Sequence, residues 1–551
     1  MTSSAPLLSL RDLSVSFRTS AGDFAAVRNV NLELESGQTL AVVGESGSGK
    51  STTAAAINRL LPGNGRITSG QVLFAGRDLA PLREREMTSI RGAQIGLVPQ
   101  DPMSNLNPLQ RIGHQIEEAL TVHGKVTGKA ARSRAIELLE LVGIPEPEKR
   151  AAQYPHEFSG GMRQRVLIAI GLACRPRLLI ADEPTSALDV TVQRRILDQL
   201  AQLTEEMGTA VFLITHDLGL AAERADRVVV MRRGEIVEAG DSSSILSNPE
   251  HEYTKQLIAS VPSLAAERMP PRERVLISER ATGEPGAVSD HPLVEVEDLT
   301  KVFALRGRGA ANDFTAVDSV GFTIPRGQTV AIVGESGSGK STTANLVLAL
   351  EAPTSGRILF EGTDVVSLDR RGLFEFRRRV QPVFQNPYAS LDPRFTVERS
   401  IAEPLAVHRI GDAGTRKARV AELLDQVSLA PALADRLPHE LSGGQRQRVA
   451  IARALALAPK LVVLDEAVSA LDVVVQAQVL DLLAELQREL DLSYLFISHD
   501  LAVVRMVSDV VHVMQRGRFV ESGTPEQIFG APQEAYTQEL LAAIPHARRA
   551  A

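Results

Sequence analysis

Apolar residues along the chain follow a two-residue period in two segments and form short unbroken runs in six others. In segments 8–17 and 292–303 apolar residues largely alternate with polar ones, which is the period of a strand with one buried face. We expect antiparallel strands there, open on one side. The unbroken apolar runs lie at 40–43, 178–181, 211–214, 330–333, 461–464 and 495–497. Such runs are typical of parallel strands that helices cover on both faces.

Between residues 100 and 159 the apolar period changes to that of a helix, and the same change occurs in the second set. Apolar residues there fall at i, i+3, i+4 and i+7, namely Ala135, Leu138, Leu139 and Val142, then Val420, Leu423, Leu424 and Val427. These patterns predict an α/β fold with two tandem domains. We expect each domain to have a mainly parallel sheet core, an antiparallel β subdomain and an inserted helical subdomain.

The sequence itself repeats along with the pattern. Residues 41–53 recur almost unchanged as residues 331–343, and residues 159–161 recur as residues 442–444. The repeat unit is far too long for a solenoid, so it indicates two homologous domains.

The composition between the two copies changes to that of a linker. We expect one domain at residues 6–262 and a second at residues 292–546, each ending in a tail. Residues 263–291 contain prolines and glycines, nearly balance their charges and lack periodicity. They therefore indicate a solvated tether between the domains.

Composition excludes several classes of protein. The chain has 551 residues and a net charge of −7, from 60 basic and 67 acidic side chains, which argues against a broad nucleic-acid footprint. No apolar run approaches the roughly 18 residues that span a bilayer, and the start lacks the pattern of a signal peptide. We therefore expect neither a secreted nor an integral membrane protein. A single cysteine, Cys174, excludes disulfide frameworks, zinc fingers and cysteine-ligated iron–sulfur clusters within one chain.

Each copy contains the motif G-x4-G-K-S, at residues 44–51 and 334–341, between an apolar strand and a predicted helix. Glycines let the backbone wrap closely, so that successive N–H groups and the helix N-terminus face phosphate oxygens. The lysine of this motif reaches the β- and γ-phosphates, and the serine hydroxyl is a magnesium ligand. The residues predicted to bind nucleotide phosphates are Gly44, Ser46, Gly47, Gly49, Lys50, Ser51, Thr52, Gly334, Ser336, Gly337, Gly339, Lys340, Ser341 and Thr342.

A pair of acidic residues ends one apolar run in each copy. The first pair is Asp182-Glu183 and the second is Asp465-Glu466. An aspartate at a strand end can join the magnesium shell, and the adjacent glutamate can orient or deprotonate the attacking water. With a phosphate-binding loop upstream, the pair predicts nucleotide hydrolysis in each half.

A Ser-Gly-Gly segment precedes a predicted helix in each copy, at Ser159, Gly160 and Gly161 and at Ser442, Gly443 and Gly444. Its exposed backbone N–H groups favour an anion. Phosphate-binding loop, Ser-Gly-Gly segment, acid pair, Ser-Ala-Leu-Asp at 186–189 and 469–472, and a histidine after the last strand follow in order, twice. This series resembles the nucleotide-binding domains of ATP-binding cassette (ABC) proteins, and the resemblance covers nearly the whole chain.

The resemblance implies roles for further residues. Phe17 and Phe303 match the aromatic residue that stacks on adenine. Two ATP molecules would lie head-to-tail between the halves, each held by the loop of one half and the Ser-Gly-Gly segment of the other, with Gln445 in the second segment. The expected catalytic residues are Glu183, Gln100, His216, Glu466, Gln385 and His499. The expected Mg²⁺ ligands are Ser51, Gln100, Asp182, Ser341, Gln385 and Asp465.

A finer resemblance concerns the substrate. The glutamine loops at 100–108 and 385–393 and the tails at 249–262 and 532–545 are similar to those of oligopeptide/dipeptide importers. This likeness implies an ATPase at the cytoplasmic face of the cell membrane that drives import of di- or oligopeptides. Glutathione, a nickel complex or another peptide-like ligand is the alternative substrate. The implied partners are two integral-membrane permease subunits and an extracytoplasmic substrate-binding protein. The tyrosines at 253 and 536 predict helix packing in the tails, with no chemistry.

A competing hypothesis is a soluble tandem ABC ATPase that acts on the ribosome or on DNA. Translation-type members carry a long, charged, helical linker, whereas residues 263–291 are short, nearly neutral and broken by prolines. Repair-type members need cysteine-ligated zinc, which a single cysteine does not supply. We therefore expect no nucleic-acid partner.

The two halves depart from the family pattern at different positions. Met162 replaces the usual glutamine after the first Ser-Gly-Gly, and Ala467-Val468 replaces the usual Pro-Thr after the second acid pair. In a head-to-tail arrangement both departures fall on one site, built from Lys340, Asp465, Glu466 and Ser159. Since one lost hydrogen bond typically costs about 1 kcal/mol, we expect this site to be slower and still active.

Overall fold

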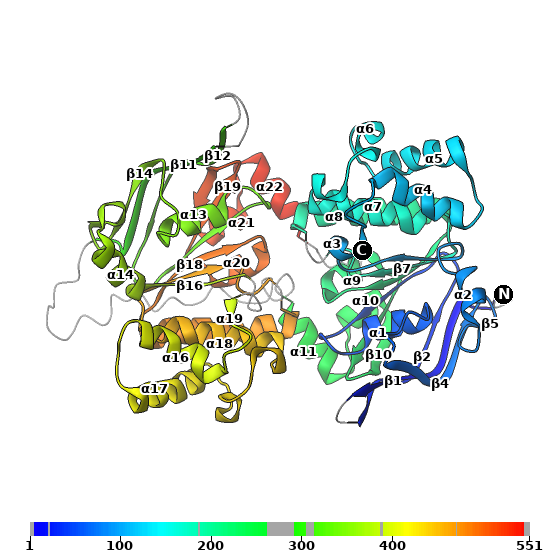
Figure 1. Cartoon of the computed structure of the whole chain (residues 1–551), viewed down its shortest axis with the longest axis horizontal. Helices are drawn as coiled ribbons and strands as arrows, with labels where there is room; N and C mark the ends of the chain where they lie inside the picture. The colour runs from blue at the N-terminus through cyan, green and yellow to red at the C-terminus, as the bar shows by residue number, and fades with distance from the viewer. Residues whose placement is uncertain are drawn as a thin grey trace. The chain divides into compact units, whose positions relative to one another are not determined.

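The computed structural model describes residues 5–19, 22–185, 188–261, 291–304, 313–385, 390–469 and 471–544. Those before 262 form one compact unit, and those after 290 form a second (Figure 1). Apart from His291, the predicted linker lies outside the described residues, and so do the predicted C-terminal ends of both domains. The predicted domain boundaries therefore stay predictions.

The first unit contains two sheets. Its strands are β1 (Leu8–Thr19), β2 (Gly22–Leu34), β3 (Thr39–Val43), β4 (Gly65–Phe74), β5 (Arg77–Asp78), β6 (Ile95–Val98), β7 (Leu178–Asp182), β8 (Ala210–Ile214), β9 (Arg227–Arg232) and β10 (Glu235–Asp241). One sheet is antiparallel in the order β2-β1-β4-β5. The other has the order β10-β9-β3-β8-β7-β6, and only its edge strand β10 runs antiparallel to its neighbour.

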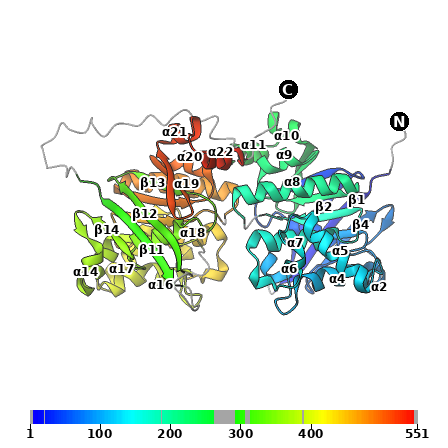
Figure 2. The same ribbon diagram turned by 90° about the horizontal axis from the view of Figure 1, so that it is seen from above.

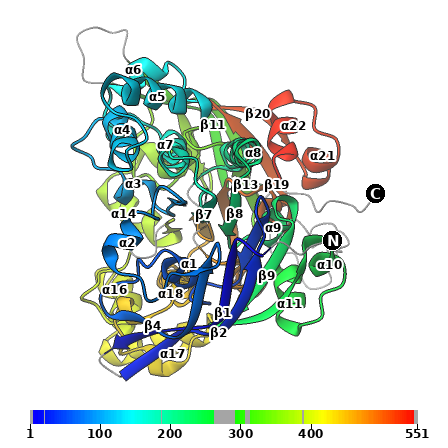
Figure 3. The ribbon, with the colours of Figure 1, turned by 90° about the vertical axis from the view of Figure 1, so that its right-hand side faces the viewer.

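A helical segment follows β6 and returns to β7. The helices of the first unit are α1 (Lys50–Ile57), α2 (Glu84–Thr88), α3 (Pro102–Asn105), α4 (Ile112–Val122), α5 (Gly128–Leu141), α6 (Pro147–Ala151), η1 (Pro155–Glu157), α7 (Gly160–Leu172), α8 (Val190–Met207), α9 (Leu218–Arg224), α10 (Ser242–Ser247) and α11 (Glu252–Ser260). Figure 3 shows α4 to α7 at one end of this unit, the antiparallel strands at the other end, and β7 and β8 between them. The predicted helical subdomain and antiparallel subdomain are thus confirmed.

The second unit repeats this order. Its strands are β11 (Val294–Ala304), β12 (Asp313–Ile324), β13 (Thr329–Val333), β14 (Ser355–Phe360), β15 (Thr363–Asp364), β16 (Val380–Val383), β17 (Leu461–Asp465), β18 (Ser493–Ser498), β19 (Val510–Gln515) and β20 (Arg518–Gly523). Its helices are α13 (Lys340–Val347), η4 (Val365–Ser367), α14 (Arg370–Arg379), α16 (Val397–Val407), α17 (Ala413–Gln426), η5 (Pro431–Leu433), η6 (Pro438–Glu440), α18 (Gly443–Leu455), α19 (Val473–Leu490), α20 (Leu501–Val507), α21 (Pro525–Gly530) and α22 (Ala535–Ala542). The sheet orders are β12-β11-β14-β15 and β16-β17-β18-β13-β19-β20.

The apolar runs of the sequence form the parallel strands, and these strands are buried on both faces. In the first unit β3 lies between β8 and β9, and its residue Ala41 pairs with Leu213 on one side and Val228 on the other. All three residues are buried. A strand covered on both faces has no solvent side for polar residues, so its sequence is continuously apolar. Polar side chains therefore first occur where these buried strands stop, at their carboxyl ends.

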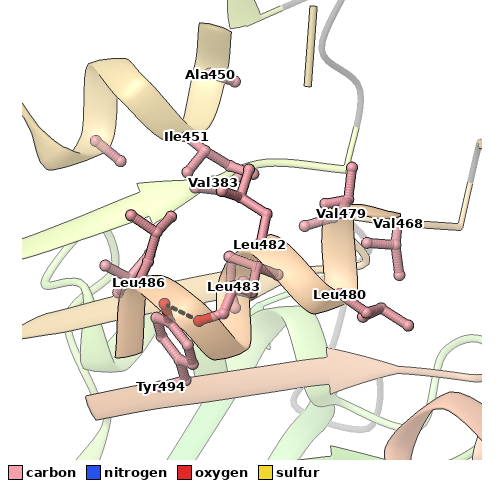
Figure 4. Packing of buried hydrophobic residues seen from close by; sticks show 14 of the residues in the cluster. Val383, Ala450, Ile451, Val468, Val479, Leu480, Leu482, Leu483, Leu486 and Tyr494 are labelled. Atoms are coloured by element: carbon pink, nitrogen blue, oxygen red, sulfur yellow. Dashed lines mark hydrogen bonds between the residues drawn. The ribbon is translucent and has the colours of Figure 1, made fainter. Parts of the chain in front are cut away.

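The core of the second unit includes buried side chains of α18 and α19. Figure 4 shows Val479, Leu482 and Leu486 of α19 packed with Ile451 of α18. The phenol of Tyr494 is buried in the same cluster and donates its hydroxyl proton to the Leu483 carbonyl oxygen at 2.9 Å. Burial of a polar group is tolerated there because it has a hydrogen-bond partner.

Two short helices end each unit as a tail. In the first unit α10 contacts α9, beside which Figure 2 shows it, and also contacts β10, and α11 follows it. In the second unit α21 contacts β19 and β20, and α22 follows. Across the ranges that the structure describes, none of the helices is long and apolar enough to cross a membrane.

Candidate functional site

The predicted phosphate-binding loop of each half joins a parallel strand to a short helix. In the first unit the loop runs from the end of β3 to Lys50, the first residue of α1. Gly44 has a φ of +148°, and a Cβ at this position would lie 2.1 Å from the carbonyl oxygen of Met231. Gly334 repeats the arrangement, with a φ of +153° and 2.2 Å to the carbonyl of Met514. Only glycine fits a backbone that approaches its neighbouring strand so closely.

The lysine of each loop is buried and turned back onto the loop. Lys50 Nζ donates hydrogen bonds to the carbonyl oxygens of Gly44 and Glu45, at 2.6 and 2.9 Å. Lys340 Nζ donates to the matching carbonyls of the second half, at 2.8 Å in both cases. Each ammonium group is thus held at the loop that the motif predicts to surround phosphates.

The first carboxylate of each acid pair lies beside the serine that ends the loop motif. The Ser51 hydroxyl donates to Asp182 Oδ1 at 3.0 Å, and the Ser341 hydroxyl donates to Asp465 Oδ1 at 3.1 Å. Burial raises the pKa of Asp182 and of Asp465, and the serine hydrogen bonds oppose that rise. A hydroxyl and a partly buried carboxylate side by side are the oxygen ligands that Mg²⁺ prefers.

The second carboxylate of each pair is the centre of a hydrogen-bonded group. Glu183 Oε2 accepts from Gln100 Nε2 at 2.8 Å and lies 3.4 Å from His216 Nδ1. In the second half Gln385 Nε2 donates to Glu466 Oε2 at 2.6 Å, and His499 Nδ1 lies 3.3 Å from Glu466 Oε1. The structure therefore brings the predicted glutamate, glutamine and histidine together in each half.

Both glutamates have the same unusual backbone conformation. Glu183 and Glu466 adopt left-handed conformations, with φ of +44° and +48°. Their N–H groups donate to carbonyl oxygens near the ends of the neighbouring strands, those of Ile214 and Ile497, both at 2.9 Å. Non-glycine residues with positive φ are uncommon and cluster at functional sites.

Charge pairing perturbs the pKa of each glutamate and histidine. Burial alone raises the pKa of Glu183, but the hydrogen bond and charge of His216, with the charge of Lys50, more than offset it, so the net shift is downward. Burial lowers the pKa of His216, but Glu183 and Asp217 more than offset it, so the net shift is upward. Glu466 and His499 shift in the same directions. The carboxylate–imidazolium pair is therefore present between the ordinary pKa values of the two groups. It is lost when pH rises through the raised histidine pKa or falls through the lowered glutamate pKa.

The Ser-Gly-Gly segments cap helices α7 and α18, and the two caps differ. Ser159 Oγ accepts from the Met162 N–H, and Ser442 Oγ accepts from the Gln445 N–H, both at 3.3 Å. Only the second cap is reciprocal, because Gln445 Oε1 accepts from the Ser442 N–H at 3.0 Å. Met162 has no side-chain amide oxygen, so its side chain does not accept a hydrogen bond from the Ser159 N–H. The predicted pairing of each cap with the loop of the other half stays a prediction.

The predicted adenine-stacking residues lie near the ends of β1 and β11. Phe17 pairs with Phe24 on β2, and Phe303 pairs with Phe314 on β12. In the second half the Lys301 ammonium lies 4.9 Å from the centre of the Phe303 ring. The structure places both aromatic rings at matching positions, and their contact with adenine stays a prediction. Of the Ser-Ala-Leu-Asp segments, residues 186, 187 and 470 lie outside the described residues.

A contact that the sequence did not predict joins each tail to its loop. The N–H of Glu45 donates to the Tyr253 hydroxyl at 3.0 Å, and the N–H of Glu335 donates to the Tyr536 hydroxyl, also at 3.0 Å. Tyr253 is buried, as the prediction of helix packing requires. The only signal in the sequence was the recurrence of a tyrosine at the same place in both tails, which says nothing of its partner.

Two strand–loop–helix sites, each with a paired aspartate and glutamate, define this protein as an ABC-type ATPase. Residues 27–186 and 317–469 match the family described as ABC transporter, and the chain belongs to that family. Residues 237–284 and 520–551 match the oligopeptide/dipeptide transporter C-terminal region. The predicted family, its tandem arrangement and the ATPase activity are thus confirmed.

Curated relatives match nearly the whole chain. The peptidoglycan transport ATP-binding protein YejF of Agrobacterium fabrum (strain C58) is 48% identical over 549 residues, which cover 98% of this chain and 97% of the relative. The glutathione import ATP-binding protein GsiA of Salmonella typhimurium (strain LT2) is 46% identical over 561 residues, covering 98% of this chain and 90% of the relative. A solved structure, the ATP-binding cassette MJ0796 bound to ADP and Pi, is 32% identical with a TM-score of 0.39 and covers 43% of this chain and 98% of that one.

Proposed function

We propose that this chain is the energy-coupling ATPase of an importer for short peptides and peptide-like compounds, and that it acts at the cytoplasmic face of the membrane. The single observation that carries the proposal is that each half has a full set of hydrolytic side chains, joined by the same hydrogen bonds. An importer that binds two ATP molecules needs two such sets. One chain supplies both, so the halves are proposed to pair with each other.

Glu183 and Glu466 are proposed as the general bases. Each carboxylate has a pKa below its ordinary value, so it is ionised at neutral pH and able to accept a proton from water. The amide of Gln100 and the imidazole of His216 hold two sides of the first carboxylate. This fixes the carboxylate toward the space beside the loop, where a water would attack the γ-phosphate. His216 is also proposed to contact the γ-phosphate once nucleotide is bound.

Lys50 and Lys340 are proposed to hold the phosphates. In the structure their ammonium groups are bound by loop carbonyls, and phosphate oxygens are stronger acceptors for a buried cation than neutral carbonyls are. The lysine therefore has a short path from the loop carbonyls to the β- and γ-phosphates. This local charge stabilises the negative charge that develops on the transferred phosphoryl group.

The donor atoms at the serine–aspartate contact fit a magnesium ion. The Ser51 hydroxyl and Asp182 carboxylate are adjacent in the first half, as are Ser341 and Asp465 in the second, and Gln100 and Gln385 reach the neighbouring glutamates. Bound there, Mg²⁺ would neutralise phosphate charge and orient the nucleotide. These serines, aspartates and glutamines are proposed to hold it.

The similarity to two transport ATPases supports the substrate class. One relative is named for glutathione, which is a tripeptide, and the other for peptidoglycan, whose fragments carry short peptides. The tail regions match an oligopeptide/dipeptide transporter family. A peptide-like compound is the chemistry that these names share. Separate permease subunits and an extracytoplasmic binding protein are the proposed partners, because the substrate itself must contact them. The alternative of a ribosome- or DNA-acting ATPase is not favoured by any of these similarities.

Reconstitution with the cognate permeases tests the proposal. ATP hydrolysis should be slow for the chain alone and rise several-fold with permeases and a binding protein loaded with glutathione or a dipeptide. The double variant Glu183→Gln, Glu466→Gln should retain ATP and lose turnover by at least 100-fold, the lower end of what a general base contributes. Parental turnover in the double variant would overturn the assignment of the base. Failure of every peptide to stimulate hydrolysis would overturn the substrate class.

A further inference from the structure

The tail tyrosine of each half reaches the start of the phosphate-binding loop. The donor is the backbone N–H of the second loop residue, Glu45 or Glu335, and the acceptor is the hydroxyl of Tyr253 or Tyr536. The paired residues are 208 positions apart in the first half and 201 in the second. Both homologous halves keep this long-range hydrogen bond at the same distance although other positions have diverged, which indicates a selected contact with the nucleotide loop.

The same loop peptide is also held from its other side. Lys50 Nζ donates to the Gly44 carbonyl at 2.6 Å while Tyr253 accepts the Glu45 N–H, and these two groups belong to one peptide. Lys340 and Tyr536 hold the peptide between Gly334 and Glu335 in the same way, at 2.8 and 3.0 Å. When the lysine turns to the phosphates, its bonds to the loop carbonyls are lost. The tyrosine bond does not use a group that the phosphates need, so it can persist.

The tail is anchored well enough to carry such a restraint. Glu238 of β10 accepts the N–H groups of Glu250 and His251, at 2.9 and 3.1 Å, just before α11 begins. Glu521 of β20 accepts the N–H groups of Gln533 and Glu534, at 2.8 and 3.2 Å, just before α22 begins. Each tail helix is thus tied to the antiparallel edge strand of the main sheet, which one strand separates from the strand that leads into the loop.

A difference between the halves concerns the ring of the tyrosine. The guanidinium of Arg232 lies 4.7 Å from the centre of the Tyr253 ring. Residue 515, which takes the place of Arg232 in the second half, is a glutamine. Cation–π contacts of this kind add to the stability of a ring's position, so Arg232 helps to hold the ring of Tyr253.

We infer that Tyr253 and Tyr536 are positioning residues for the phosphate-binding loop: each holds the first peptide of the loop in place after the lysine has moved to the nucleotide. The inference rests on the proposed roles of Lys50 and Lys340. Removal of the tyrosine hydroxyl should therefore destabilise the loop more in the nucleotide-bound state than in the free state, because the lysine restrains the loop only in the free state. Removal of the hydroxyl should therefore weaken nucleotide affinity.

Binding of ADP with Mg²⁺ to the full chain tests the inference one half at a time. In a Lys50→Ala background, which leaves the second half to bind, Tyr536→Phe should raise the Kd for ADP about fivefold. The matched control is Tyr494→Phe in the same background. It also removes a buried tyrosine hydroxyl bond from the second unit, to the Leu483 carbonyl, and should leave the Kd within error of the parental value.

The opposite half gives a second arm of the same experiment. Tyr253→Phe in a Lys340→Ala background should also raise the Kd for ADP about fivefold, and this arm decides the question if Tyr536→Phe does not fold. In steady-state hydrolysis the loss should appear in the KM for ATP and only weakly in kcat, whereas a general loss of structure would lower kcat.

Failure of the inference is distinguishable from failure of the proposed function. If the Lys50→Ala, Lys340→Ala double variant binds ADP like the parent, the proposed phosphate sites are wrong. If that double variant loses ADP binding while Tyr536→Phe and Tyr253→Phe bind as tightly as the Tyr494→Phe control, the sites stand and the positioning role is overturned.

Discussion

The two halves of the chain are nearly identical at the hydrolytic residues and different at the helix caps. The serine–aspartate contacts are 3.0 and 3.1 Å, and the histidine–glutamate contacts are 3.4 and 3.3 Å. In contrast, the α18 cap has two reciprocal hydrogen bonds and the α7 cap has one. The two repeats have therefore kept the same hydrolytic residues and differ in the helix cap that is proposed to face the ATP of the other half.

The second departure, Ala467-Val468, leaves the adjacent glutamate in place. Both residues are buried, and Val468 belongs to the apolar core of the second unit (Figure 4). Glu466 still has the φ of its counterpart, +48° against +44°. The apolar pair therefore substitutes for Pro184-Thr185 without turning the proposed base away. This agrees with a slower site better than with an inactive one.

The largest expected difference separates the two proposed bases in single variants. If the site with Glu466 works about fivefold more slowly, as one lost hydrogen bond suggests, then Glu183→Gln should lower turnover of the assembled transporter about sixfold. Glu466→Gln should lower it by only about a sixth. Steady-state ATPase assays measure both. Equal losses, or a greater loss with Glu466→Gln, would show that the halves do not differ in this way.

A smaller effect is expected when the weaker cap is repaired. Met162→Gln restores the residue that makes the reciprocal cap at Gln445, so it should speed the slow site. In a Glu183→Gln background, where that site supplies the remaining turnover, hydrolysis should rise about two- to fivefold. Gln445→Met in a Glu466→Gln background is the matched control and should reduce the remaining turnover by a similar factor. No change in either variant would place the asymmetry elsewhere, with Ala467-Val468 as the remaining candidate.

The smallest expected effect is confined to one histidine. Glu183 raises the pKa of His216 against the lowering effect of burial, so Glu183→Gln should lower that pKa in nucleotide-free protein. His499, paired with Glu466, should keep its value. NMR titration of histidine Cε1–H signals measures both. A His216 pKa that does not fall would mean that the carboxylate does not hold the imidazolium in solution.

The parallel strands, helical segments and loop motifs could be predicted because they depend on local pattern. The run Leu178–Ala181 became β7, and Leu138 and Leu139 became the buried face of α5. The site residues were also found, but Gln100 and His216 only through family resemblance. Both come to Glu183 through folding, and the glutamine lies 83 positions away in the chain. A periodic pattern among neighbouring residues does not show which distant side chains come together.

Two hydrogen bonds that escaped prediction share one property: a backbone group is one of the two partners. The Tyr253 hydroxyl binds the N–H of Glu45, and the Gln445 side chain binds the N–H of Ser442. Every residue except proline carries an N–H, so the sequence does not mark which one will be used. The tyrosine was therefore visible as a repeated residue, and its partner was not.

The presence of both units on one polypeptide has a genetic consequence. Two identical subunits encoded by one gene acquire every mutation twice, so their two composite sites must change together. Here a single codon change alters one cap, at 162 or at 445, and leaves the other untouched. Each molecule is also made with one cap of each kind, whatever the level of expression. The two caps can therefore be selected separately, and the difference between them is inherited as a unit.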